Sequence, residues 1–284
     1  MVRPAIVVHG GAGAGPERLP NLQPAIEAAR RVFEAGGNAI EAVVEACVIL
    51  EDDPVFNAGT GSVLRNDGSV LTDASLHVSD GRLGFVAVME NTPNPIRICV
   101  DLLDEELNGL AGAGARAWAD ERGHTNAPVI GRPPKGNQGD LGELGAPLSS
   151  TDDSATDTVG AIARDSNGLI AAATSTGGTS HRPPGRVGDV PLPGCGFWAD
   201  EGLAVAATGV GEAITRALLS YRVHERIVAS GKRSPDALTA AMNWGIDSLI
   251  APDKQVGIIA LGPEGEGAGV ANTDMPWATW CAEP

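Results

Sequence analysis

Residues 157–178 read DTVGAIARDSNGLIAAATSTGG and contain two strand signals with a turn between them. Thr158–Ala163 and Leu169–Thr174 are runs of small apolar residues that are typical of buried strands. The turn sequence DSNG at 165–168 lies between them and predicts a pair of neighbouring strands. The first strand of this pair begins abruptly at Thr158, directly after a long polar segment.

That upstream segment, residues 123–157, differs from the rest of the chain. It contains GRPPKGNQG at 131–139 and SSTDDS at 149–154, and it has no hydrophobic periodicity. At about 35 residues it is too long for a normal connection within a compact domain. We expect it to be a lid, a linker, or a tail that is tolerated because the chain is cut.

Local signals predict strands and helices on both sides of this segment. Asn38, with Glu41 three residues later, predicts a capping box for a helix that ends near Asp52–Pro54. Further helices are expected at 24–35, 96–104, 111–121, 211–224 and 236–249. Strands are expected at 5–8, 84–90, 204–207, 255–261 and 268–271, and a hairpin at 62–71. This pattern suggests helices covering a layered antiparallel or mixed sheet.

Composition and charge argue against several classes of function. The 284 residues are 43% hydrophobic, so a sizeable core can form. The formal charge of −16 argues against a nucleic-acid partner, and it reflects either ordinary solubility or adaptation to high salt. The sequence contains no apolar run of about 18 residues, so no membrane span is predicted. The N-terminal apolar run is too short for a signal peptide, so a cytoplasmic protein is expected.

Cysteine and histidine spacing indicates neither a zinc site nor a disulfide framework. None of the four cysteines belongs to a CxxC pair; they are Cys47, Cys99, Cys195 and Cys281. The scattered histidines form no HExxH pattern: His77, His124, His181 and His224. The HGGAG motif at 9–13 follows a strand, as phosphate-binding and esterase oxyanion loops do. No P-loop or GxSxG sequence accompanies it, so a tight structural turn is the favoured interpretation.

Four short motifs in the second half carry polar residues in a fixed order. They are DTVG at 157–160, TSTGG at 174–178, PGRVGD at 184–189 and TGVGE at 208–212. Singly, each has an ordinary explanation, such as a strand threonine or a surface Arg–Asp pair. Together they are specific. With VVHGGAG at 7–13 and PVFNAGTGSVL at 54–64, the chain resembles the plant-type asparaginase and isoaspartyl peptidase family of N-terminal nucleophile hydrolases.

This resemblance implies an α+β fold, the αββα four-layer sandwich, in which two stacked sheets lie between helical layers. It also implies self-cleavage between Asp157 and Thr158. Residues 1–157 would become an α subunit ending in a loose linker, and residues 158–284 a β subunit, within one folded unit. Two such cleaved units would pair into a dimer.

The chemistry of a threonine nucleophile explains why cleavage matters. Its hydroxyl is a poor nucleophile until a base removes the proton. If Thr158 becomes N-terminal, its own α-amine, with a pKa of about 7.7–8, can be that base. By resemblance, Thr176 supports the Thr158 hydroxyl or amine, and Asn57 helps to hold the site. Thr208 and the Gly209 N–H form the oxyanion hole by the same resemblance.

The substrate follows from charge. Arg186 can bind an α-carboxylate bidentately, and Asp189 can bind an α-ammonium group. Together they fit L-asparagine and β-aspartyl dipeptides, small molecules whose side-chain amide or isopeptide bond would be cleaved. The alternative for these two residues is a surface salt bridge.

Other functions stay open. Many asparaginases of this family have glycine before the nucleophile. In this chain Asp157 occupies that position, and glycosylasparaginases and threonine aspartases also have aspartate there. Residues 179–182 are particular to this chain. An unprocessed binding homologue is a further alternative. No catalytic cofactor is expected. The resemblance implies a sodium ion held by backbone oxygens in a loop with Leu50, Glu51, Asp53, Phe56, Ala58 and Thr60.

Overall fold

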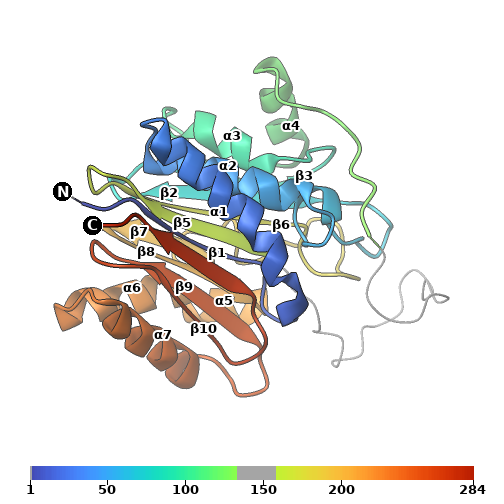
Figure 1. Cartoon of the computed structure of the whole chain (residues 1–284). Coiled ribbons are helices and arrows are strands. Elements are labelled where there is room, and N and C mark those ends of the chain that lie inside the picture. The colour runs from blue at the N-terminus through green and yellow to red at the C-terminus, as the bar shows by residue number, and fades with distance from the viewer. Residues whose placement is uncertain (1, 133–157) are drawn as a thin grey trace.

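The computed structural model describes residues 2–132 and 158–284. Two β-sheets lie face to face between two layers of helices, and the chain ends lie close together at one edge (Figure 1). This arrangement confirms the predicted αββα sandwich. Residues 133–157, with Asp157 and most of the predicted lid, linker or tail, lie outside the described residues.

Residues 157–178 supply strands β5 and β6 at the centre of the larger sheet. This sheet has seven strands in the order β11-β1-β5-β6-β2-β3-β4. Every pairing is antiparallel except the parallel pair β3–β4. The strands are β1 Ala5–His9, β2 Thr72–Val78, β3 Leu83–Met89, β4 Gly109–Ala111, β5 Val159–Arg164, β6 Ile170–Thr176 and β11 Trp277–Cys281.

The smaller sheet has four antiparallel strands in the order β10-β9-β8-β7. They are β7 Phe197–Asp200, β8 Leu203–Gly209, β9 Val256–Leu261 and β10 Ala268–Ala271. Small aliphatic side chains fill the space between the sheets, among them Val7, Ile162, Ala172, Ala206 and Ile259. Because these side chains are short, the two sheets can approach closely, and β5 and β8 both contribute side chains to one core.

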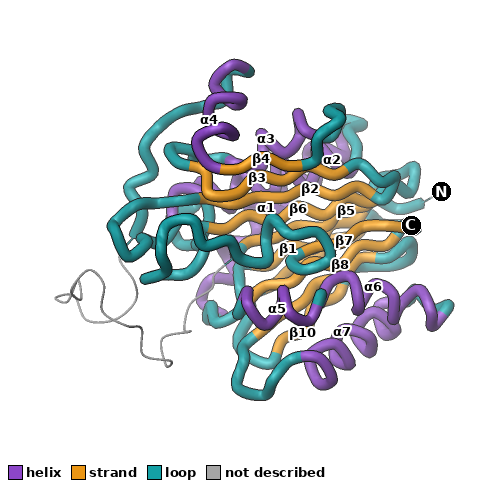
Figure 2. The backbone as a smooth tube through the Cα atoms, turned by 180° about the vertical axis from the view of Figure 1, so that it is seen from behind, coloured by secondary structure: helices purple, strands orange, loops and turns teal. Residues whose placement is uncertain are grey.

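Helices cover the outer face of each sheet (Figure 2). The larger sheet carries α1 Leu19–Glu34, α2 Ala39–Asp52, α3 Pro95–Leu102 and α4 Gly112–Glu121, and the smaller carries α5 Gly211–Ala217, α6 Leu219–Ser230 and α7 Pro235–Leu249. The described residues also contain two 3₁₀ turns, η1 Pro16–Arg18 and η2 Gly59–Gly61. Helix α2 packs directly on β5 and β6. Within the described residues, no helix combines the length and hydrophobicity needed to cross a bilayer.

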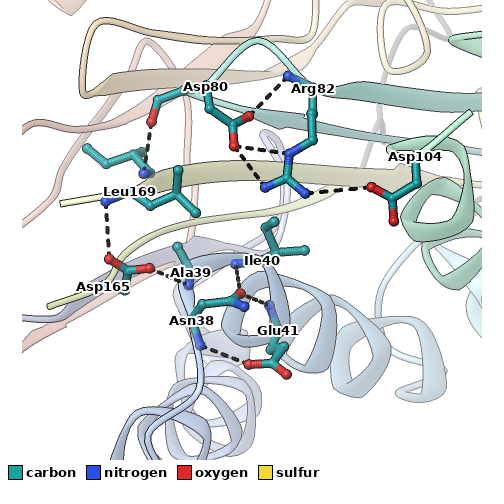
Figure 3. Close-up of polar contacts among 11 residues, drawn as sticks. Asn38, Ala39, Ile40, Glu41, Asp80, Arg82, Asp104, Asp165 and Leu169 are labelled. Carbon is teal, nitrogen blue, oxygen red and sulfur yellow. Dashed lines mark hydrogen bonds and ion pairs between the residues drawn. The ribbon is translucent and has the colours of Figure 1, made fainter. Parts of the chain in front are cut away.

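The start of α2 is held by the predicted capping box and by the β5–β6 turn (Figure 3). Asn38 Oδ1 accepts hydrogen bonds from the N–H groups of Ile40 (2.9 Å) and Glu41 (3.1 Å), and the Glu41 carboxylate accepts from Asn38 N–H at 2.8 Å. The Asp165 carboxylate accepts from Ala39 N–H at 3.3 Å. The helix and the strand pair are therefore joined at the end of β5 opposite Thr158.

Residues 62–71 do not form the expected hairpin of strands. The turn at 66–68 is present, but within these residues no strand ladder flanks it. Val63 instead donates its N–H to the Asn57 side chain and forms an isolated bridge with Arg132. Contacts with distant parts of the chain replace the local pairing on which the hairpin prediction depended.

The helix expected at 211–224 is two helices. Leu218 adopts a left-handed conformation with φ 48°, which ends α5 and begins α6. The change of direction lets Ile214 in α5 and Val223 in α6 both be buried, while Leu218 stays 48% exposed. No Gly or Pro signals this break, so the local sequence predicts one continuous helix.

Strands β2, β4, β7 and β11 had no predicted counterpart. Strand β2 reads TDASLHV and is buried along its whole length despite its polar residues. Its burial follows from its position between β6 and β3 in the sheet, which only the tertiary structure decides.

Candidate active site

The predicted nucleophile lies at the entry to the central strand of the larger sheet. Thr158 directly precedes β5 and is 4% exposed. Val159 pairs with Ser175, so the antiparallel register sets Thr158 beside Thr176 at the end of β6. The Thr158 hydroxyl donates to Thr176 Oγ1 at 3.2 Å, and Thr176 Oγ1 also accepts from Gly178 N–H at 3.0 Å. The structure therefore brings together the two threonines that the sequence singles out.

Thr208 and Gly209 end strand β8 in the smaller sheet. Thr208 is fully buried, and its Oγ1 accepts from Ala12 N–H at 3.3 Å. In this hydrogen bond the Thr208 oxygen is the acceptor, and the hydroxyl proton takes no part in it. Gly209 has φ +126°, and a Cβ there would collide with the Gln255 backbone, so only glycine fits.

The HGGAG loop joins these two parts of the site. His9 ends β1 opposite Gly160 of β5, and a Cβ on Gly160 would collide with the imidazole. Burial lowers the pKa of His9 to about 3, although a hydrogen bond with the Thr158 backbone acts to raise it. His9 is therefore a neutral structural group whose Nδ1 accepts from Gly11 N–H at 3.2 Å. The same loop contributes Ala12, a contact with Thr208 that the interpretation as a simple turn did not predict.

Asn57 ties the 54–64 loop to the end of β6. Its Nδ2 donates to the Gly178 carbonyl at 2.6 Å, and its Oδ1 accepts from Val63 N–H at 3.0 Å. Its backbone carbonyl accepts from Gly177 N–H at 3.0 Å. Asn57 is fully buried and holds the loop that follows Thr176 by two hydrogen bonds, while the third fixes its own loop.

Arg186 and Asp189 converge near the first turn of α5. Arg186 forms a bidentate ion pair with Glu212, with Nε–Oε1 at 3.1 Å and Nη2–Oε2 at 2.9 Å. The alternative of an Arg186–Asp189 surface salt bridge is therefore wrong, because Glu212 is the ion-pair partner and Asp189 is buried. Asp189 Oδ1 and Arg186 Nη2 lie 2.7 and 2.9 Å from the position of a Cβ built on Gly211. Both groups thus surround one small space.

The buried charges around this space perturb one another. Burial raises the pKa of Asp189 to about 7, while the positive charge of Arg186 opposes that rise. Asp73 lies opposite Thr176 in the β2–β6 register, and burial raises its pKa to about 6. The Asp73 carboxylate accepts from Val88 N–H at 2.7 Å, and Arg65, only 3% exposed, lies close enough to lower the Asp73 pKa.

Glu51 supports the site from behind. It lies near the end of α2, where Ser175, the residue before Thr176, donates its hydroxyl to Glu51 Oε1 at 2.7 Å. Asn94 and the Ile96 N–H also donate to this carboxyl group. Burial raises the pKa of Glu51 to about 8, with the three hydrogen bonds opposing. Sequence reasoning named Glu51 only for its backbone oxygen; its position in an apolar helix was the one available signal for a buried side chain.

Metal ligands do not gather in the described parts of the chain. Within residues 2–132 and 158–284, no group of three or more His, Cys, Asp or Glu side chains is arranged to hold an ion. The four cysteines are free. The arrangement instead offers two adjacent threonine hydroxyls, a third hydroxyl with a glycine N–H, and an arginine and an aspartate that face the same small space.

Comparison with known proteins gives a consistent result. A family model described as asparaginase matches residues 2–131 and 134–283. The chain is 33% identical to an isoaspartyl peptidase of Salmonella typhimurium, covering 99% of this chain and 96% of that protein. It is 36% identical to a plant-type L-asparaginase of Pyrobaculum calidifontis, covering 97% and 96%. It is also 36% identical to an isoaspartyl peptidase/L-asparaginase of Xenopus laevis, covering 86% and 82%.

Proposed function

The chain belongs to the asparaginase family, and from that premise we propose that it hydrolyses the side-chain amide of L-asparagine and the isopeptide bond of β-aspartyl dipeptides. Its relatives are named for isoaspartyl peptidase activity, for L-asparaginase activity, or for both. The observation that carries the proposal is the hydroxyl pair of Thr158 and Thr176, 3.2 Å apart, at the ends of two paired strands.

Thr158 is the nucleophile of this proposed reaction. After cleavage of the 157–158 bond, its α-amine takes the hydroxyl proton as the oxygen attacks the substrate carbonyl. The amine and the hydroxyl belong to one residue, so little orientational entropy is lost. The protonated amine then gives its proton to the leaving ammonia or amino acid. Water hydrolyses the resulting ester of Thr158 and restores the enzyme.

Thr208 and Gly209 are the proposed oxyanion hole. A hydrogen bond from Ala12 N–H orients the Thr208 hydroxyl, and we assign this hydroxyl to the charged oxygen of the intermediate. The fixed, glycine-only backbone at Gly209 supports the same role, because a rigid N–H needs no reorganisation during the reaction.

Arg186 and Asp189 are the proposed headgroup site. Glu212 occupies the Nε–Nη2 edge of the Arg186 guanidinium, and we assign its Nη1–Nη2 edge to the substrate α-carboxylate. Glu212 then acts as a positioning residue that fixes the orientation of this plane. Asp189 binds the α-ammonium group, which offsets the unfavourable burial of its carboxylate.

Replacement of Thr158 tests the nucleophile. Thr158→Ala should remain one uncleaved chain and release no ammonia from L-asparagine, because both reactions need this hydroxyl. Thr158→Ser is the matched control and should keep reduced cleavage and activity. Intact-mass analysis and an ammonia assay measure both properties. An active Thr158→Ala, or active wild-type protein whose 157–158 bond is intact, would contradict the assignment.

Two further classes remain distinguishable by simple assays. Asp157 before the nucleophile is the feature shared with glycosylasparaginases and threonine aspartases. A panel of L-asparagine, β-aspartyl dipeptides, a glycosylasparagine and a protein substrate separates these activities. A chain that never matures on a denaturing gel would instead favour the binding homologue.

A structural sodium ion, a dimer of cleaved units and a cytoplasmic location belong to the same proposal. The carbonyl oxygens of Glu51, Pro54 and Phe56 crowd around Gly59 and Gly61, where a Cβ would strike them. Backbone oxygens gathered in one loop suit a hard cation, and the proposed ligands are the backbone oxygens of Leu50, Glu51, Asp53, Phe56, Ala58 and Thr60. Replacing NaCl by choline chloride should then lower the thermal midpoint, and the molecular mass in solution reports the dimer.

A further inference from the structure

Asp73 is a fully buried carboxylate beside the active site, and the proposed reaction gives it no role. It pairs with Thr176 across β2 and β6, and directly opposite residues of an antiparallel pair share one face of the sheet. Ala172 lies on this same face of β6 and belongs to the core between the two sheets. Since Thr176 contacts Thr158 on the other side, the three polar side chains lie in a row across the neighbouring strands β5, β6 and β2, which Figure 2 shows.

The segment that carries Asp189 packs over the same face. Thr174 on β6 donates its hydroxyl to the Val190 carbonyl at 3.5 Å. Burial is the main cause of the raised pKa values of both aspartates, but the charge of Arg186 lowers the pKa of Asp73, and Asp73 raises the pKa of Asp189. These mutual effects mean that the three charged groups lie close together. The row across the sheet therefore leads from the nucleophile to the headgroup residues.

Each of the two aspartates has a carboxylate oxygen without a donor. Asp73 Oδ1 accepts from Val88 N–H at 2.7 Å, whereas its Oδ2 is buried and has no hydrogen-bond partner among residues 2–132 and 158–284. Asp189 Oδ2 is buried without a hydrogen-bond partner in the same parts of the chain. A buried carboxylate oxygen that lacks a donor raises the free energy of the folded state. Two such oxygens near one headgroup site predict a ligand group that carries both positive charge and several N–H donors.

Arg65 is a buried cation nearby, but it does not supply these donors. Its guanidinium lies against Gly178, and its Nη2 donates to the Leu71 carbonyl at 3.3 Å. Its Nε and Nη1 have no hydrogen-bond partner among the described residues, so neither of them binds Asp73. Its positive charge nevertheless lowers the pKa of Asp73, against the larger effect of burial. Arg65 therefore favours the ionised form of Asp73 and leaves Oδ2 available to a ligand.

We propose that Asp73 is a second acceptor for the α-ammonium group of the substrate, and that it shares this group with Asp189. The inference rests on the proposed hydrolysis of L-asparagine and β-aspartyl dipeptides, and it adds a specificity-determining residue to that site. Arg186 binds the α-carboxylate, and the ammonium group, which has three N–H donors, lies between the two aspartates.

This arrangement restricts the class of substrate. A substrate must carry a free α-amine, because only a charged ammonium group satisfies two buried carboxylates. An asparagine or aspartate inside a polypeptide has its α-nitrogen in a peptide bond and carries no such charge. The site therefore favours free amino acids and N-terminal β-aspartyl groups over internal positions of a protein substrate.

Calorimetric titration of the cleaved protein with L-aspartate and succinate at pH 8 tests the proposal. L-Aspartate is the acid that the proposed reaction releases, and succinate is the same molecule without the ammonium group. Wild type should bind L-aspartate more tightly than succinate. Asp73→Asn keeps a side-chain oxygen for Val88 N–H and removes the negative charge, so it should bind L-aspartate about tenfold more weakly. Its affinity for succinate should not fall, because succinate offers Asp73 no cation.

Two further variants complete the experiment. Asp80→Asn is the matched control: Asp80 lies beyond the other end of β2 and pairs with Arg82 at the surface, so its loss should change neither affinity. Asp189→Asn tests the proposal without any change at Asp73. If Asp73 shares the ammonium group, Asp189→Asn should still bind L-aspartate about tenfold more tightly than succinate.

Any of four results would overturn the assignment. They are no binding of L-aspartate by wild type, equal L-aspartate affinity in Asp73→Asn and wild type, an equal loss of affinity for both ligands in Asp73→Asn, and no preference between the ligands in Asp189→Asn. Thermal unfolding and intact-mass analysis check that each variant is folded and cleaved. Ammonia release from L-asparagine by wild type is measured separately. Its absence would contradict the proposed function, whereas normal release with one of the four results would contradict only the role of Asp73.

Discussion

The Thr208 hydroxyl illustrates how single residues set the chemistry of this site. It is fully buried, accepts a hydrogen bond from Ala12 N–H, and belongs to the smaller sheet, whereas Thr158 precedes a strand of the larger sheet. Removing its oxygen would affect the transition state more than substrate binding, because negative charge develops on the carbonyl oxygen only during attack.

Thr208→Val should therefore lower kcat by about 10²–10³ with little change in KM. Valine keeps the branched shape of threonine and loses the hydroxyl, so packing in β8 is preserved. Thr208→Ser keeps the hydroxyl and should stay within about tenfold of wild type. Steady-state ammonia release measures both constants. A Thr208→Val enzyme with wild-type kcat would exclude the hydroxyl from the oxyanion hole.

Asp189 predicts a pH-dependent KM. Its pKa is raised to about 7 by burial, so the carboxylate takes up a proton as the pH falls through that value and loses its attraction for the substrate ammonium. KM for L-asparagine should rise about tenfold between pH 8 and pH 6. Asp189→Asn should have a high KM that varies little over this range. A wild-type KM that is constant from pH 8 to pH 6 would contradict this role.

At the scale of elements, the N-terminus of α2 connects a local sequence signal with the placement of the site. The capping box fixes where the helix starts, and Asp165 in the β5–β6 turn binds the same end of the helix. At the other end, Glu51 binds Ser175 next to Thr176. Helix α2 therefore holds the strand pair at both ends, so its register on the sheet influences the position of the two threonines.

Asn38→Ala should lower the free energy of unfolding by about 1 kcal/mol, within the usual range of roughly 0.5–2 for a lost cap. Asn38→Ser restores a side-chain acceptor and should recover most of the loss. Urea unfolding in the Thr158→Ala background measures this on an uncleaved chain. The same substitution in the active enzyme should leave kcat unchanged, because Asn38 lies at the opposite end of the strand pair. Equal stability of Asn38→Ala and wild type would show that Asp165 suffices to hold the helix.

At the scale of the whole molecule, the net charge is strongly negative. A chain of −16 repels itself when folded. Added salt screens the repulsion between surface carboxylates, and the screening length falls from about 10 Å at 0.1 M to about 3 Å at 1 M.

If the acidic composition is an adaptation to salt, the thermal midpoint should rise steeply between 0.1 M and 2 M KCl. Comparison with choline chloride at equal concentration separates screening by any salt from a specific effect of the cation. A midpoint that is already maximal in dilute buffer would favour ordinary solubility as the reason for the charge.

The sequence alone determined those features that local interactions specify. The Asn38–Glu41 cap, the strand pair around 165–168 and the start of a strand after Thr158 could be read from short spacings, because hydrogen bonds and hydrophobic alternation within a few residues produce them. The ordered motifs identified the family and hence the layered fold.

The tertiary structure decided which distant groups meet. It gave Arg186 the partner Glu212, joined Ala12 to Thr208, buried the polar strand β2 and broke the helix at Leu218. These contacts form only when two sheets and their helices pack together. Their energies depend on burial and on neighbours far away in the chain, which no local pattern encodes.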